Sequence, residues 1–234
     1  MKKTPLLFLL LLNASLLVGC SPSRVSYKEA TKEEFDTYFT SEKVSAAQQA
    51  FESIKSFCFV CDQHTDEMDY HLERYFDTNY YYCEYAYTAG EEKEEACALY
   101  LIDSNVENSK RYEIEDGKQD LATGETAANA FNEEVTYQRR IISRSMDDYL
   151  YLAGEYLEDS VVDKYYIGSN NTIKVAVKDN KSESKGYATF DKESLLIYSV
   201  RIDVKNEYGT GFVEYSFSYQ QVEHKTPKDI GFNV

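Results

Sequence analysis

The sequence predicts an α+β fold, in which a large curved antiparallel β-sheet has helices covering its concave apolar face. Three segments in the last third alternate apolar and polar residues with a period of two, which is typical of a sheet with one covered and one wetted face. Two other segments, residues 42–55 and about 125–157, carry apolar residues at helical spacing. We expect these helices to pack on the apolar face, because the chain offers no other cover.

Length, composition and charge restrict the class of protein. The 234 residues contain neither an internal repeat nor a sharp change of composition, which favours one domain. Hydrophobic residues make up 43% of the chain and aromatic residues 15%, enough to fill a core, so the chain is not a disordered segment. The net charge is −16, whereas nucleic-acid-binding proteins present basic surfaces to the phosphates. We therefore expect no nucleic acid partner.

The first twenty residues have the layout of a secretory signal. Lys2 and Lys3 precede an apolar run that is too short for a membrane-spanning helix. The four residues that end at Cys20, Leu-Val-Gly-Cys, resemble the lipobox of bacterial lipoproteins. This resemblance implies that residues 1–19 are a signal peptide and that Cys20 carries diacylglycerol, which anchors the chain outside the cytoplasm, in the periplasm or at the cell surface. An ordinary signal peptide with a chance cysteine is the alternative.

The charge of the mature chain predicts how it meets the membrane. Cleavage removes Lys2 and Lys3 and leaves 23 basic residues against 41 acidic ones, a net charge of −18. Anionic headgroups repel such a surface, so we expect the chain to contact its membrane partner only through the N-terminal lipid. We expect residues 20–30 to be the acylated cysteine and a polar tether, and residues 31–234 to be a single domain.

Two helices are expected at the start of the domain. Residues 31–34, Thr-Lys-Glu-Glu, fit a capping box and predict a short helix through Phe39. Ser41 can cap a second helix over residues 42–55, whose apolar residues repeat every three or four positions. Farther along, Ala127 and Phe131 suit a third helix, and Met146, Tyr149, Leu150 and Leu157 suggest a fourth.

The strands are expected in two groups. Short aromatic or β-branched segments bounded by turn residues predict strands at 57–63, 70–76, 80–87, 96–103 and, less regularly, 110–114, which Asp116 and Gly117 would close as a hairpin turn. The alternating segments predict strands near 172–178, 196–205 and 213–219. Short gaps make these hairpins antiparallel, and roughly nine to eleven strands is the size at which an open sheet curls.

The order of these elements resembles the LolA/LppX-like half-barrel proteins. The most similar stretch runs from Leu195 to Phe232 and contains a long strand, a Tyr/Phe-rich strand and a closing Thr-Pro-Lys-Asp-Ile. The resemblance implies a concave hydrophobic pocket for an acyl chain or another apolar ligand. Inward side chains that could line this pocket, or simply fill it, are Tyr198, Val213, Tyr215, Phe217, Tyr219, Phe51 and Ile54.

The cysteines and histidines are the candidates for chemistry. Acylation of Cys20 leaves Cys58, Cys61, Cys83 and Cys97, an even number that suits two disulfides in an exported chain. Cys83 and Cys97 lie seven residues on either side of Gly90 and could face each other across a hairpin, which would leave Cys58 and Cys61 as the second pair. Buried thiols, a redox Cys58–Cys61 pair and a zinc site are the alternatives. Cys61, Asp62, His64 and His71 could bind a metal, although we expect them to be solvated at a hairpin.

Three hypotheses for function follow. The first is a lipid-anchored, non-enzymatic lipoprotein that binds a lipid or another hydrophobic small molecule in the concave pocket. The second is an envelope interaction protein with a packed core, which acts through its acidic surface on a protein partner that the sequence does not identify. The third is a redox protein that uses Cys58 and Cys61. The sequence contains no GxSxG, P-loop, GxGxxG or HExxH motif, so we expect no catalytic residues, no metal and no cofactor.

Overall fold

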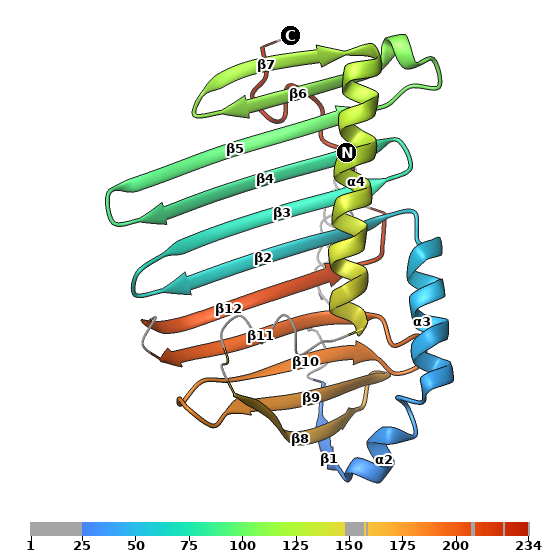
Figure 1. Cartoon of the computed structure of the whole chain (residues 1–234), viewed down its shortest axis with the longest axis vertical. Helices are drawn as coiled ribbons and strands as arrows, with labels where there is room; N and C mark the ends of the chain where they lie inside the picture. Colours follow the sequence, from blue (N-terminus) through green and yellow to red (C-terminus); the bar gives the residue numbers. More distant parts are fainter. Residues whose placement is uncertain (1–24, 148–156, 158, 207–208, 222, 234) are drawn as a thin grey trace, which may run out of the picture.

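The computed structural model describes residues 25–147, 157, 159–206, 209–221 and 223–233, without the side chains of residues 141–147 and 206 (Figure 1). The predicted signal peptide, residues 1–19, and Cys20 lie outside the described residues, as do Tyr149 and Leu150. Among the helices described, none is long and apolar enough to cross a membrane.

Twelve antiparallel strands form one open, half-barrel-like sheet (Figure 1). From one edge to the other, the strands are β1 (Tyr27–Ala30), β8 (Ser160–Gly168), β9 (Thr172–Asp179), β10 (Lys185–Asp191), β11 (Ile197–Asn206), β12 (Gly209–Ser218), β2 (Phe57–Thr65), β3 (Asp69–Asp77), β4 (Tyr80–Ala89), β5 (Glu92–Leu101), β6 (Lys110–Glu115) and β7 (Lys118–Thr123). The prediction of a large antiparallel sheet is confirmed. The pairing of β12 with β2 joins the two predicted groups of strands.

The helices are α2 (Lys32–Asp36), α3 (Ser41–Ser53) and α4 (Gly124–Asp147), with a 3-10 turn, η1, at Val106–Asn108. The predicted capping box is present at Thr31 and Glu34, but α2 ends at Asp36 rather than at Phe39. Thr40, not Ser41, caps α3, because its hydroxyl accepts a hydrogen bond from the backbone N–H of Lys43.

Four strands escaped prediction because their residues show no clear alternation. Most of β7 is polar and exposed, β10 buries only small residues along much of its length, and β8 has a register shift between Val162 and Lys164. Residues 27–30, which were expected in the tether, form the edge strand β1. Asp116 and Gly117 do make the expected turn, with φ of 48° and 74°, and it joins β6 to β7.

The sheet has an inner face, defined as the face that α3 and α4 contact. The Phe51 ring of α3 lies 5.7 Å from the Phe57 ring of β2, and the Phe131 ring of α4 lies 6.4 Å from that of Tyr100 on β5. In Figure 1, α4 crosses β2 to β5 near one end of these strands, and the strands continue well beyond it toward the β2–β3 and β4–β5 turns.

The outer face also has an apolar cluster, contrary to the expectation of a face left entirely to water. Its buried residues are Tyr75, Tyr80, Tyr82, Leu99 and Tyr112. Ile230 and Phe232, from the segment after the last strand, pack against this cluster. The C-terminal segment therefore covers part of the outer face of β3 to β6.

Candidate binding site on the inner face of the sheet

Most of the predicted pocket residues lie in the packed inner core. Val213, Tyr215, Phe217 and Phe51 are only 0 to 7% exposed. The Phe59 ring lies 5.9 Å from the Tyr215 ring and 5.2 Å from the Phe217 ring, so these side chains fill space against one another. Ile54 and Tyr219 pack at the margin of the same core, and the Tyr219 hydroxyl donates to the Ile197 carbonyl at 2.8 Å.

The placement of Tyr198 among the inward residues was wrong. Its side chain is 40% exposed, while the neighbouring Ile197 is fully buried. The pairing of β10 with β11 slips at this point, from Thr189 opposite Ser199 to Phe190 opposite Ile197. This bulge reverses the alternation, because one extra residue turns the next side chain to the other face.

On the inner face, β3, β4 and β5 extend well beyond the point where α4 crosses them (Figure 1). The register places Tyr85 opposite Leu72 on one side and Ala96 on the other. Together with their neighbours on the same face, these residues form what we call the inner shelf: Tyr70, Leu72, Cys83, Tyr85, Ala96 and Ala98. All of them are half-buried except Leu72, which is 7% exposed.

The chemistry of the inner shelf is apolar with a few polar groups. The hydroxyls of Tyr70 and Tyr85 make no hydrogen bond within the described part of the chain, and burial raises the pKa of Tyr70. Ala96 and Ala98 are small, so the Tyr85 ring has short neighbours on that side. A surface of this kind can contact a hydrocarbon chain through its rings and a polar group through its hydroxyls.

A polar group at the border of the shelf connects the sheet to α4. Tyr81 donates to Glu134 at 2.9 Å, Gln138 donates to the same carboxylate at 2.8 Å, and Arg74 donates to the Gln138 carbonyl. The Nε atom of Arg74 is buried and has no hydrogen-bond partner among the described residues. The guanidinium also forms a hydrogen bond with Cys83, and an anionic or carbonyl group of a ligand could accept a further hydrogen bond from it.

The expected Cys83–Cys97 pairing was wrong. The hairpin turns about Gly90 and Glu91, so Cys83 faces Ala98, and Cys97 faces Glu84. Cys83 therefore lies on the inner face and Cys97 on the outer face, and no disulfide joins any of the cysteines described. Cys61 and Cys58 are divided between the faces in the same way, as residues three apart on a straight strand must be.

The outer thiols do not suit redox catalysis. Burial raises the pKa of Cys58 to about 11, with a smaller contribution from the Glu73 charge. Burial likewise raises the pKa of Cys97 to about 11. At neutral pH both groups are protonated, whereas the attacking species in thiol chemistry is the thiolate.

The histidines do not gather at a metal site. Each has an aspartate partner: His64 with Asp69, His71 with Asp62 at 2.6 Å, and His224 with Asp77 at 3.2 Å. Cys61 faces inward, away from the His71–Asp62 pair. Within the described ranges, no group of three or more His, Cys, Asp and Glu side chains could hold a metal ion.

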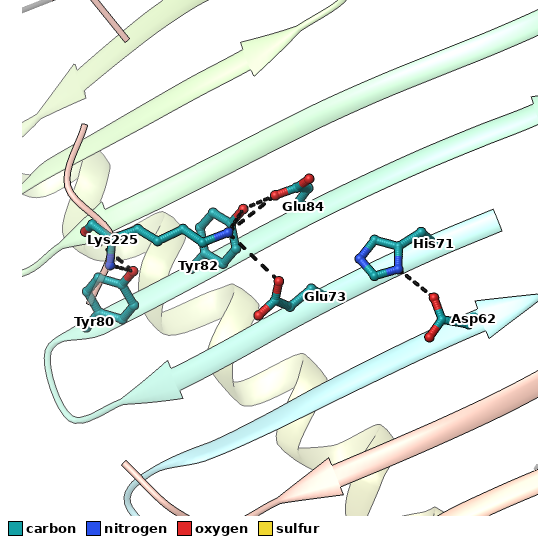
Figure 2. A network of polar contacts seen from close by, with 7 residues as sticks. All are labelled: Asp62, His71, Glu73, Tyr80, Tyr82, Glu84 and Lys225. Carbon is teal, nitrogen blue, oxygen red and sulfur yellow. Dashed lines mark hydrogen bonds and ion pairs between the residues drawn. The ribbon is translucent and has the colours of Figure 1, made fainter. Parts of the chain in front are cut away.

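A network on the outer face fixes the C-terminal segment to β3 and β4 (Figure 2). The Lys225 ammonium contacts the Tyr82 hydroxyl at 2.6 Å and the carboxylates of Glu84 and Glu73 at 3.4 and 3.8 Å. The Lys225 backbone N–H donates to the Tyr80 hydroxyl at 2.8 Å. The hydrogen bond from Tyr82 lowers the pKa of Glu84, which keeps this carboxylate charged beside the ammonium. We assign this network a structural role, because its members satisfy one another.

The comparisons with known proteins add no relative: no family model and no curated protein matches the chain.

Proposed function

We propose that the chain is a membrane-anchored extracytoplasmic lipoprotein whose domain binds a lipid or another hydrophobic molecule without catalysis. The inner shelf is the observation that carries this proposal. It is a half-buried apolar surface with two tyrosine hydroxyls and the Arg74 Nε that lack partners among the described residues. The lipobox-like residues that end at Cys20 support the anchor.

In this proposal, α3 and α4 cover part of the concave face of a LolA/LppX-like half-barrel, and the ligand completes the cover over the inner shelf. Burial of apolar surface contributes about 25 cal/mol per Å², so an acyl chain that removes roughly 200 Å² from water gains about 5 kcal/mol. Arg74 would hold the polar end of the ligand, since a guanidinium binds carboxylate and phosphate groups well.

A second candidate is supported by the packing of the inner core. Val213, Tyr215 and Phe217 are almost fully buried and line none of the cavities of about 500, 460 and 330 Å³ in the described part of the chain. A domain with a filled core could act instead as an interaction module, through the acidic surface that a net charge of −18 implies for the mature chain.

Native mass spectrometry of the full chain, extracted from its own membrane, distinguishes the two candidates. If the domain binds a lipid, the measured mass should include a co-purifying lipid in addition to the acyl anchor. The variant Ala96→Phe should lose this mass, because the new ring occupies the inner shelf beside Tyr85. The matched control is Ala86→Phe on the outer face of β4, which should keep it.

Two results would contradict the proposal. A wild-type protein without bound lipid favours the interaction module, and an Ala96→Phe variant that retains the lipid removes the shelf as the site. Separately, Cys20→Ser should move the protein from the membrane fraction to the soluble fraction, since two acyl chains are needed for stable anchoring.

A further inference from the structure

The outer face of β8 to β11 contains a cavity of about 500 Å³, on the opposite side of the sheet from the inner shelf. Ala176 of β9 is paired with Lys164 on one side and Tyr187 on the other, so a methyl group lies between two long side chains. Tyr166 and Tyr187 flank the hollow, and the segment Ser182–Ser184 closes one end. The volume is in the range of small-molecule sites.

Lys174 is the unusual residue of this cavity. Its ammonium lies 4.3 Å from the ring centroid of Tyr27, 5.2 Å from that of Tyr166 and 4.8 Å from that of Tyr187. Three rings hold the charge in place, and partial burial lowers the pKa of Lys174. No carboxylate of the described residues forms an ion pair with it, although the mature chain has a net charge of −18.

The carboxylates that line the cavity are already engaged. Asp163 pairs with Lys178 at 3.2 Å, Asp203 pairs with Arg201 at 3.1 Å, and Glu183 pairs with Lys205. Asp179 accepts hydrogen bonds from the Ser182 hydroxyl at 2.6 Å and from the Asp159 backbone N–H at 2.9 Å. Three of these carboxylates are paired with a cationic side chain and the fourth, Asp179, is held by hydrogen bonds, so the Lys174 charge and the tyrosine rings remain for an incoming ligand.

We propose that this cavity binds an anionic sugar, that is, a pyranose ring bearing a carboxylate or a phosphate. The Tyr166 and Tyr187 rings offer apolar faces for the C–H groups of the sugar. Lys174 supplies the counter-charge as a single ammonium, which pairs with either anion. This site is independent of the proposed lipid site, because the two lie on opposite faces.

Saturation-transfer NMR on the full chain in detergent tests the proposal with three probes: methyl β-glucuronide, glucose 6-phosphate and the neutral methyl β-glucoside. We expect at least one anionic probe to bind about tenfold or more tightly than the neutral one, the effect of one favourable charge contact. The tighter of the two anions identifies the ligand as a carboxylate or a phosphate sugar.

Two variants assign the effect to the cavity. Lys174→Gln should weaken the anionic probe to the level of the neutral one, and the control Lys228→Gln, in the C-terminal segment, should change nothing. Tyr187→Ala should weaken all three probes, with a thermal melt to verify folding. The proposal is wrong if no anionic probe binds in preference to the neutral one, or if Lys174→Gln leaves that preference intact.

Discussion

The two halves of the sheet bury their residues in different ways. In β9 to β12, the inner face is sealed and the outer face is largely polar, so buried residues such as Ile202 and Val213 alternate with exposed or half-exposed ones. In β3 to β5, α4 contacts the inner face and the C-terminal segment packs on the outer face. A clean alternation of apolar and polar residues therefore identifies a strand with one face in water, and a strand with apolar contacts on both faces lacks this signal.

The largest difference between the halves should be in stability. Ile202→Ala removes a fully buried side chain from the sealed half, and we expect a loss of about 2–5 kcal/mol in the free energy of unfolding. Tyr85→Ala, on the half-buried shelf, should cost about 1 kcal/mol. Urea denaturation measures both. Equal losses in the free energy of unfolding would mean that the inner shelf is packed as closely as the core around Ile202.

The outer cover of β2 to β5 should protect thiols. Because burial raises the pKa of Cys58 and Cys97 from 9.0 to about 11, their thiolate fraction at pH 8 falls about 100-fold. Alkylation of these two residues in the native protein should therefore be about 100-fold slower than in urea, followed by peptide mass spectrometry. Thiols that react equally fast in both states, or a disulfide found without reductant present, would contradict this geometry.

The same cover should contribute a moderate part of the stability. The Phe232 ring lies 5.0 Å from the Tyr112 ring, edge to face, and packs against the outer cluster. We expect Phe232→Ala to lower the free energy of unfolding by about 1–3 kcal/mol and to increase the binding of a hydrophobic dye. Val106→Ala is a suitable control, because Val106 is 41% exposed. An unchanged variant would show that the C-terminal segment does not stabilise β3 to β6.

The smallest effect should be the pH dependence of the Lys225 network. The hydrogen bond from Tyr82 lowers the folded pKa of Glu84 below its ordinary value of 4.5. A lowered pKa stabilises the protein above that value, and the contribution is lost as the pH falls through the folded pKa. Glu84→Gln should therefore flatten the loss of stability on the acid side, measured by thermal melts from pH 6 to pH 3. A variant with the same acid dependence as the wild type would contradict this role.

The sequence was informative where a single physical cause controls the pattern. The capping box at Thr31, the Asp116–Gly117 turn and the alternation around Val213 each depend on local chemistry, and the structure contains all three. The bulge that exposes Tyr198 and the turn that separates Cys83 from Cys97 each depend on one residue of register, which a single sequence does not determine.

The candidate sites were less predictable than the fold. The inner shelf requires knowing where α4 crosses the strands, and the helical pattern does not specify this position. The ring cage around Lys174 combines Tyr27, Tyr166 and Tyr187 from β1, β8 and β10, three strands that escaped prediction. The only available signal was the abundance of tyrosine, 22 in all, which does not indicate which rings converge.

The edge strand β1 limits the distance between the domain of the proposed lipoprotein and the bilayer. Only seven peptide units separate Cys20 from Tyr27, where β1 begins, so these two residues can be at most about 25 Å apart. With acyl chains on Cys20, the edge of the sheet formed by β1 and β8 would lie close to the headgroups, and the β7 edge could extend into the aqueous space. The Lys174 cavity lies near the β1 edge, so it would bind sugars that are within a few nanometres of the lipid surface.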